Sequence, residues 1–217
     1  MEKLIRIRFG ACFGLLMVIT VLAFGDWQFW NTESIEGKLA ENWKVKLEEE
    51  FRFTDGIKEF YYHHTDGSLT YRLTDWFYPG LNYRQIYEKK DGEWEEEKRP
   101  HFSGTFKWKW QDFKFKDRNR FEYRIRKEKN DVWRYRNKLS LIFPIRWTKL
   151  MIQPYLADEV FINLENAEFS RNRLYAGINL RFFSHLKTVI FYLWQTSNKD
   201  SGWIDYNIVG AKLKVEF

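Results

Sequence analysis

The fold of this chain is decided by its final stretch, Val209-Gly210-Ala211-Lys212-Leu213-Lys214-Val215-Glu216-Phe217. One parity holds the apolar side chains of Val209, Ala211, Leu213, Val215 and Phe217, and the other holds Gly210 and charged residues. This period of two describes a β-strand with one apolar and one polar face. Chain ends are usually polar and frayed, so an aromatic last residue in register is informative.

Outer-membrane β-barrels of Gram-negative bacteria commonly end in such a strand. The stretch 209–217 resembles their assembly signal, which implies the barrel-assembly machinery as a partner. The apolar parity would then face lipid and the charged parity would face the inside of a barrel.

The other end of the chain is typical of a secretory signal peptide. A short basic region precedes an apolar run over 9–24, and Ala23 and Gly25 supply the small residues of a cleavage site. We predict cleavage before Asp26, with a signal peptide over 1–25 and one domain over 26–217. An uncleaved anchor helix is the alternative. The single cysteine, Cys12, lies in this segment, so the mature chain would have no disulfide.

The composition agrees with a membrane barrel. Aromatic residues make up 20% of the chain and charged residues 30%, with a formal net charge of +6. A barrel needs apolar and aromatic side chains outside and polar ones inside. No later segment has the 18 consecutive apolar residues of a membrane helix. Basic and acidic residues alternate in an exported chain, which argues against a nucleic-acid partner.

The alternation continues upstream and predicts ten antiparallel strands. They lie over 43–53, 57–73, 77–88, 102–110, 113–125, 133–143, 150–162, 172–183, 186–195 and 203–217. The segment 27–39 also resembles a strand, and 116–119 is a competing turn. We therefore expect an all-β, antiparallel transmembrane β-barrel of about 10–12 strands, and the sequence does not decide whether their number is odd or even. A soluble secreted β-barrel or sandwich is the alternative fold.

Connection lengths suggest an orientation. Polar segments at 89–100, 127–132, 163–171 and 196–202 are expected to be long loops, and 74–76, 145–149 and 184–186 are expected to be short turns. Outer-membrane barrels keep short turns on the periplasmic side and longer loops outside. This predicts a periplasmic C-terminus.

Aromatic residues gather near the ends of the predicted strands. They are Trp43, Phe53, Trp76, Phe77, Trp108, Trp110, Trp133, Trp147, Trp194 and Trp203. Such rings are favoured where hydrocarbon meets headgroups. We expect two girdles in contact with outer-membrane lipid and lipopolysaccharide.

Charged residues occupy the inward parity. The candidate lumen network comprises Glu48, Glu50, Arg52, Arg84, Arg120, Glu122, Arg124, Arg134, Arg136, Glu159, Arg173 and Arg181. In one hypothesis, guanidinium–carboxylate pairs fill and rigidify a narrow barrel. In the other, the arginine excess lines a path for anionic solutes. The expected strand number lies between that of barrels filled by side chains and that of barrels with an open channel, so it does not decide between the two hypotheses.

Few residues could perform chemistry. His63 and His64 are adjacent on a strand and point to opposite faces, so they cannot share a metal. We expect no metal, no cofactor and no catalytic residue. The enzyme alternative is a lipid hydrolase in which His64 or His101 approaches a serine such as Ser68, Ser103 or Ser140.

The mature chain resembles a bacterial family of outer-membrane barrels of unknown function. The resemblance is carried by Glu50-Phe51-Arg52-Phe53, Leu81-Asn82-Tyr83-Arg84, Arg120-Phe121-Glu122-Tyr123-Arg124, Trp133-Arg134-Tyr135-Arg136, Gln153-Pro154-Tyr155 through Asp158-Glu159, and Asn172-Arg173. It implies an outer-membrane barrel and supplies no substrate or catalytic residue.

These observations predict an exported outer-membrane barrel with a charged, arginine-rich lumen. Its expected function is a narrow channel for small anionic solutes or a structural role in the envelope. The alternative is a barrel-embedded lipid-modifying enzyme.

Overall fold

The structure is a computed structural model that describes residues 27–55, 57–127, 129–199 and 201–217. The predicted cleavage site at Ala23 and Gly25 and the cysteine Cys12 lie outside the described residues. In the described part of the chain, no helix has the length and apolar character needed to cross a membrane.

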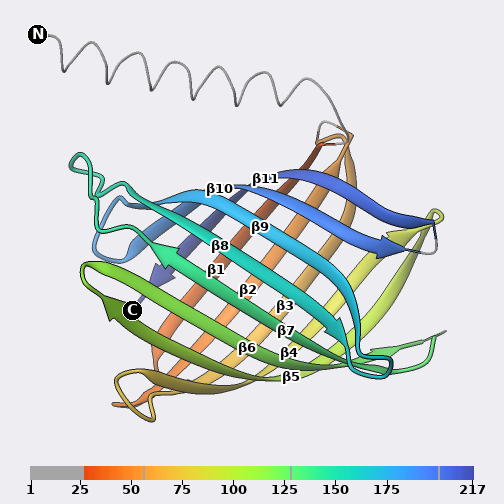
Figure 1. The fold of residues 1–217 in the computed structure, drawn as a ribbon, viewed down its shortest axis with the longest axis horizontal. Coiled ribbons are helices and arrows are strands. Elements are labelled where there is room, and N and C mark those ends of the chain that lie inside the picture. Colours follow the sequence, from red (N-terminus) through yellow and green to blue (C-terminus); the bar gives the residue numbers. More distant parts are fainter. Residues whose placement is uncertain (1–26, 56, 128, 200) are drawn as a thin grey trace, which may run out of the picture.

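The described residues form a closed β-barrel of eleven strands (Figure 1). The strands are β1 (Trp27–Lys38), β2 (Trp43–Thr54), β3 (Glu59–Tyr71), β4 (Phe77–Lys90), β5 (Glu93–Trp110), β6 (Phe113–Arg126), β7 (Val132–Ile142), β8 (Gln153–Asn163), β9 (Glu168–Arg181), β10 (Leu186–Lys199) and β11 (Gly202–Glu216). The prediction of an all-β barrel of 10–12 strands is confirmed.

The barrel closes through a parallel pair of strands. Each strand from β1 to β11 is antiparallel to the next, whereas β1 runs parallel to β11, with Trp27 opposite Asn207 and Glu36 opposite Glu216. An odd number of strands in an up-and-down order places the first and last strands in the same direction. The strand-like segment 27–39 therefore forms the strand that completes the barrel, and the number of strands is odd.

The two ends of the barrel are named here by the residues that mark them. The Phe217 end carries the C-terminal residue and the connection between β5 and β6, and the Gly92 end carries the turn between β4 and β5. Because β1 is parallel to β11, Trp27 lies at the Gly92 end and Lys38 at the Phe217 end.

Two predictions about connections are wrong. The segment 89–100 is no loop, since β4 and β5 run through it and turn at Asp91 and Gly92, both with positive φ. The predicted difference in loop length is absent, because the longest connection, 143–152, lies at the Phe217 end. The competing turn at 116–119 lies inside β6, whereas the single strand predicted over 57–73 is present as β3.

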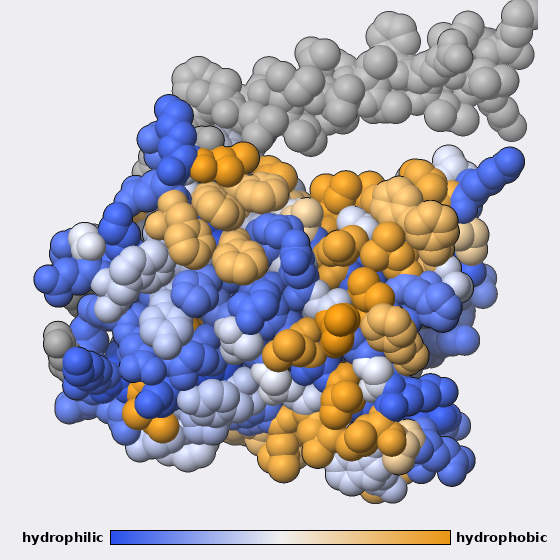
Figure 2. Space-filling view, turned by 180° about the vertical axis from the view of Figure 1, so that it is seen from behind, coloured by the Kyte–Doolittle hydropathy of each residue, from blue (hydrophilic) through white to orange (hydrophobic). Residues whose placement is uncertain are grey.

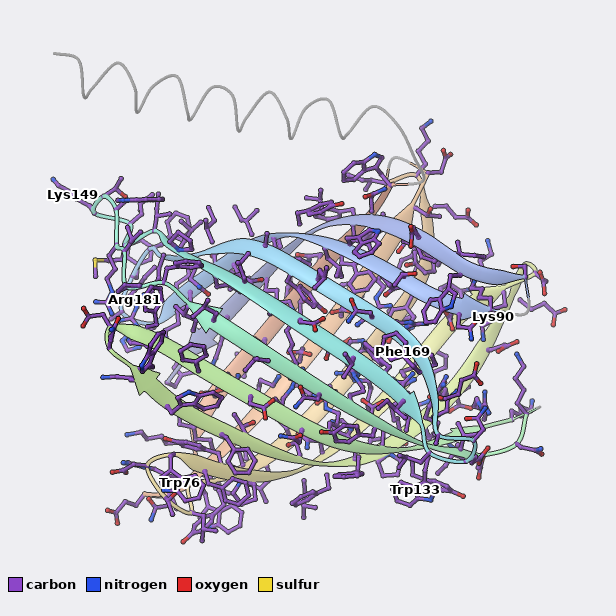
Figure 3. All side chains as sticks on the ribbon, viewed as in Figure 1. Trp76, Lys90, Trp133, Lys149, Phe169 and Arg181 are labelled. Atoms are coloured by element: carbon purple, nitrogen blue, oxygen red, sulfur yellow. The ribbon has the colours of Figure 1, made fainter. Side chains whose placement is uncertain are left out.

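The outer surface carries aromatic residues near both ends. At the Phe217 end Trp43 packs on Tyr71 and Trp108 on Phe115, with ring centroids 4.7 and 5.3 Å apart. At the Gly92 end the pairs Tyr123–Trp133 and Phe169–Trp203 lie 4.9 and 5.5 Å apart. Figure 3 shows Trp76 at one end and Trp133 and Phe169 at the other. This arrangement matches the two girdles expected from the sequence.

The outer surface is not uniformly apolar. Figure 2 shows hydrophilic side chains between two hydrophobic areas on one face. Glu33 lies opposite Glu49, which lies opposite Thr65 and accepts a hydrogen bond of 2.5 Å from its hydroxyl. On β6 and β7 the Asn137 amide donates to Asp117 at 2.5 Å. Polar groups outside the barrel thus satisfy one another.

The barrel interior has an apolar side and a charged side. Strands β1 and β8–β11 contribute a buried cluster of Trp30, Ala157, Tyr175, Phe191, Leu193 and Ile208. Strands β2–β7 contribute most of the buried charged residues. The interior is therefore packed at mid-height, and charge is concentrated on one side of it.

Candidate functional site

Glu122 is the centre of the buried charges. Its side chain is fully buried and accepts hydrogen bonds from Arg134 Nε at 2.9 Å and Arg136 Nη1 at 2.7 Å. Arg120 Nη1 donates to the same carboxylate at 3.4 Å, and Arg99 Nη1 lies 3.8 Å from it. Four guanidinium groups therefore share one carboxylate.

A second carboxylate extends this cluster to the neighbouring strands β8 and β9. Glu159 accepts from Arg136 Nη2 at 2.8 Å, so Arg136 joins the two glutamates. Tyr175 donates to Glu159 at 3.0 Å, and Arg173 Nη1 lies 3.7 Å from it. We call Arg99, Arg120, Glu122, Arg134, Arg136, Glu159 and Arg173 the ion-pair layer.

Two further pairs extend the charged interior toward β1–β4. Arg52 holds Glu50 through Nε at 2.8 Å and Nη2 at 2.6 Å, while Thr32 donates to Glu50 at 3.1 Å. Arg84 Nε donates to Asp66 at 2.7 Å. Charged hydrogen bonds of this length are about twice as strong as neutral ones.

Strand register brings these groups together. The inward parity of β6 carries Arg120, Glu122 and Arg124, and β7 places Arg134 directly opposite Glu122. On the next pair of strands Glu159 is directly opposite Arg173. Opposite charges at facing positions stabilise a sheet, and the alternation keeps them on one side of it.

The predicted lumen residues fall into three groups. Those buried in the interior are Glu50, Arg52, Arg84, Arg120, Glu122, Arg134, Arg136, Glu159 and Arg173. Glu48 and Arg124 are partly buried, and Arg124 binds both oxygens of Glu97 at 2.8 Å. Arg181 is exposed at the end of β9, away from the ion-pair layer (Figure 3).

Sequence reasoning missed several members of the interior. Glu97 and Arg99 belong to β5 and lie within the segment 89–100 that the sequence predicts as a loop, because the first half of β5 carries charged residues on both faces. His101 follows them on the same strand, and the sequence indicates it only as a candidate base. Asp66 sits on β3 in a stretch without a clear apolar parity. For the β5 residues, Asp91-Gly92 is the signal that indicates a strand, since Asp-Gly favours a tight hairpin.

A large basic cavity lies at the Phe217 end. It has a volume of about 780 Å³, and we call it the vestibule. Its basic lining residues are Lys44, Lys46, Lys107, Lys114, Lys116, Arg118, Arg120, Arg146, Arg181, Lys187, Lys212 and Lys214, against the acidic Glu36, Glu48, Asp66 and Glu216. Positive charge thus exceeds negative charge by eight.

Part of this positive charge is neutralised within the vestibule. Lys214 contacts Glu36 at 2.8 Å and Glu216 at 2.9 Å. In contrast, Lys114, Lys116 and Lys212 have no carboxylate within 4.0 Å among the described residues. The vestibule therefore keeps free ammonium groups on β6 and β11.

A second cavity of about 90 Å³ lies toward the Gly92 end. Glu122 lines neither cavity and is fully buried between them. Asp66 lines the vestibule and its partner Arg84 lines the smaller cavity. Within the described residues, the ion-pair layer and the Arg84–Asp66 pair separate the two cavities and close the lumen.

Among the described residues, no histidine is hydrogen-bonded to a serine as a nucleophilic pair would require. His63 stacks outside the barrel on Tyr87 at 4.9 Å, whereas His64 is buried inside. His101 Nε2 lies 3.8 Å from Asp66, but the Ser103 hydroxyl donates to the Gly80 carbonyl at 3.4 Å. Over the parts of the chain that the structure describes, no three histidine, cysteine, aspartate or glutamate side chains are arranged to hold a metal ion.

The closed barrel, the aromatic residues at both ends and the charged interior define an outer-membrane-type β-barrel. LpxR from Salmonella typhimurium has a similar fold, with a TM-score of 0.50 over 80% of this chain and 83% of that chain at 9% identity. The siderophore receptor PirA from Pseudomonas aeruginosa gives a TM-score of 0.33 at 11% identity, over 79% of this chain and 35% of that chain. No curated protein matches the chain.

The family is shown by the sequence. A family model described as "Protein of unknown function (DUF2490)" matches residues 27–206, and the chain belongs to this family. The resemblance to a barrel family of unknown function is confirmed.

Proposed function

We propose that this chain is an outer-membrane barrel that binds small anionic solutes in its vestibule. The observation that carries the proposal is the excess of eight positive charges around a cavity of about 780 Å³. Ligand cavities commonly have 300–1,000 Å³. A cleft lined by charge of one sign also raises the local concentration of solutes of opposite sign.

The same geometry supports a narrow passage less well than a binding site. The ion-pair layer blocks the lumen with fully buried groups, and moving it requires breaking several charged hydrogen bonds at once. The layer also supports the structural hypothesis, since buried pairs hold strands β5–β9 together. Solute binding and structural rigidity can therefore coexist in one closed barrel.

The membrane assignment is part of the proposal. Export by a signal peptide and a C-terminal strand recognised by the assembly machinery would place the barrel in the outer membrane of a Gram-negative bacterium. The aromatic girdles would contact lipid and lipopolysaccharide.

The lipid-modifying alternative has less support. Both of its candidate bases, His64 and His101, are buried inside the barrel and away from the lipid-facing surface. Ser103 is committed to Gly80 and Asn82. Assays of the wild type and of His101→Ala on lipid substrates in detergent test this alternative.

Tripolyphosphate provides a direct test of the vestibule. We expect saturable binding to the refolded protein by isothermal titration calorimetry, because free ammonium groups on β6 face the cavity. The double variant Lys114→Gln/Lys116→Gln should weaken binding about tenfold or more, since each charged contact is worth roughly 1.5–3 kcal/mol. Lys58→Gln removes one positive charge from an exposed site at the opposite end and should leave binding unchanged. Equal weakening by both variants would argue against the vestibule.

Planar bilayers separate a closed barrel from a passage. We expect a tight seal for the wild type, because buried ion pairs close the lumen. Steady unitary currents would favour the anion channel instead. In that case Arg124→Ala and Arg136→Ala should reduce anion selectivity. A tight seal with no tripolyphosphate binding would leave the structural envelope role.

A further inference from the structure

The smaller cavity is built almost entirely from guanidinium groups. Its lining holds eight arginines, among them Arg134, Arg136, Arg171 and Arg173, and two carboxylates, Glu88 and Glu97. Eight positive charges therefore meet two negative charges in the wall. We call it the arginine cavity.

Carboxylates lie within 4.0 Å of seven of these eight arginines. Arg134 and Arg136 share Glu122, and Arg173 Nη1 is 3.7 Å from Glu159. Arg171 has no carboxylate within 4.0 Å among the described residues, and its Nε donates to the Ser197 hydroxyl at 3.0 Å. Eight arginines therefore face six carboxylates, namely Glu50, Asp66, Glu88, Glu97, Glu122 and Glu159, and the remaining positive excess includes Arg171.

One aromatic ring holds four of the guanidinium groups close together. Phe161 is 1% exposed, and its centroid lies 4.5 Å from Arg136 Cζ and 4.9 Å from Arg173 Cζ. Arg134 and Arg171 lie 5.2 and 5.5 Å from the same ring. Cation–π attraction lowers the cost of this crowding but does not neutralise the charge.

A buried donor is also left without a partner. Arg136 is 6% exposed, and its buried Nε has no hydrogen-bond partner among the described residues. A buried charge or donor without a partner is costly, and guanidinium groups match oxyanions through paired N–H groups. The guanidinium groups that line the cavity therefore suit an anion rather than a cation or an apolar ligand.

We propose that the arginine cavity binds one free tetrahedral oxyanion of the phosphate and sulfate class. The cavity of about 90 Å³ has room for a compact anion with four oxygens. The site is separate from the vestibule, on the other side of the ion-pair layer, and stands independently of the function proposed for the vestibule.

The test uses the refolded full chain in buffer free of phosphate and sulfate. We expect inorganic phosphate and sulfate each to bind at a single saturable site in calorimetry, and to raise the melting temperature, because a ligand that binds only the folded state stabilises it.

Arg171→Gln is the discriminating variant because Arg171 belongs to no carboxylate pair. Phosphate affinity should fall about tenfold or more, and the phosphate-dependent rise in melting temperature should shrink with it. Without phosphate the variant should melt no lower than the wild type, since one unpaired positive charge is removed. Unchanged phosphate affinity in this variant, or no phosphate or sulfate binding by the wild type, would overturn the proposal.

The vestibule variant Lys114→Gln/Lys116→Gln is the matched control. It should lose tripolyphosphate affinity and keep the single phosphate site, whereas Arg171→Gln should do the reverse. If phosphate binding is lost only in the lysine variant, the oxyanion site lies in the vestibule and the arginine cavity is not a site.

Discussion

Replacing Glu122 with glutamine should lower the free energy of unfolding by about 3–5 kcal/mol, the usual cost of breaking a buried ion pair from one side. The carboxylate is fully buried and joins Arg134 and Arg136 through hydrogen bonds of 2.9 and 2.7 Å. Its loss leaves those guanidinium groups crowded together without a counter-charge. Urea unfolding in detergent measures the effect, with heat-modifiable gel migration as the readout of the folded fraction.

The control for this variant is Glu93→Gln. Glu93 is exposed at the start of β5, so the same substitution there should change stability by less than about 0.5 kcal/mol. If Glu122→Gln alone does not fold, a second substitution keeps the prediction testable. Glu122→Gln combined with Arg134→Gln should recover part of the loss, because one unpaired guanidinium is removed. Additive losses would show that the pair is not coupled.

The barrel and its inward charges could be predicted because alternation determines which face a side chain occupies. In Arg120-Phe121-Glu122-Tyr123-Arg124 the charged residues share one parity and the aromatic residues the other. The same pattern at 133–136 on β7 identifies a neighbour of like character. Local sequence thus carries the fold class and the inside–outside assignment.

Which charges meet could not be predicted, because partners depend on register between strands. Glu159 of β8 contacts Arg136 of β7 at 2.8 Å although the two are not direct register partners. The parallel pairing that closes the barrel could not be predicted either, since nothing in 27–38 distinguishes a parallel from an antiparallel partner. The vestibule and the arginine cavity exist only once eleven strands have closed.

The first half of β5 shows a different limit. Residues 93–99 carry charged side chains on both faces, so there is no apolar parity to follow. Near the end of a barrel both faces can meet water, and the membrane no longer requires alternation. A strand that extends beyond the apolar band therefore resembles a loop in sequence. For this reason the sequence does not predict that Arg99 lies inside the barrel.

Substituting alanine for Gly177 or Gly210 is expected to destabilise the barrel by about 1–3 kcal/mol, the cost of overpacking a filled interior. Phe191 is 2% exposed and lies opposite both glycines, one on each neighbouring strand. A Cβ on Gly210 would lie 2.2 Å from the Phe191 ring, and one on Gly177 would lie 2.6 Å from the Ile190 carbonyl oxygen. Thermal unfolding in detergent measures both variants.

Gly67→Ala provides the matched control, since a Cβ there meets nothing within 4 Å. It should be neutral or slightly stabilising, because alanine restricts the unfolded chain more than glycine does. If crowding against Phe191 causes the loss in Gly210→Ala, the smaller side chain of Phe191→Leu should lessen it in the double variant. The Gly177→Ala variant should gain less from Phe191→Leu, because its closest contact is backbone. Equal losses in Gly67→Ala and Gly210→Ala would show that strand flexibility, and not the space beside Phe191, sets the need for glycine.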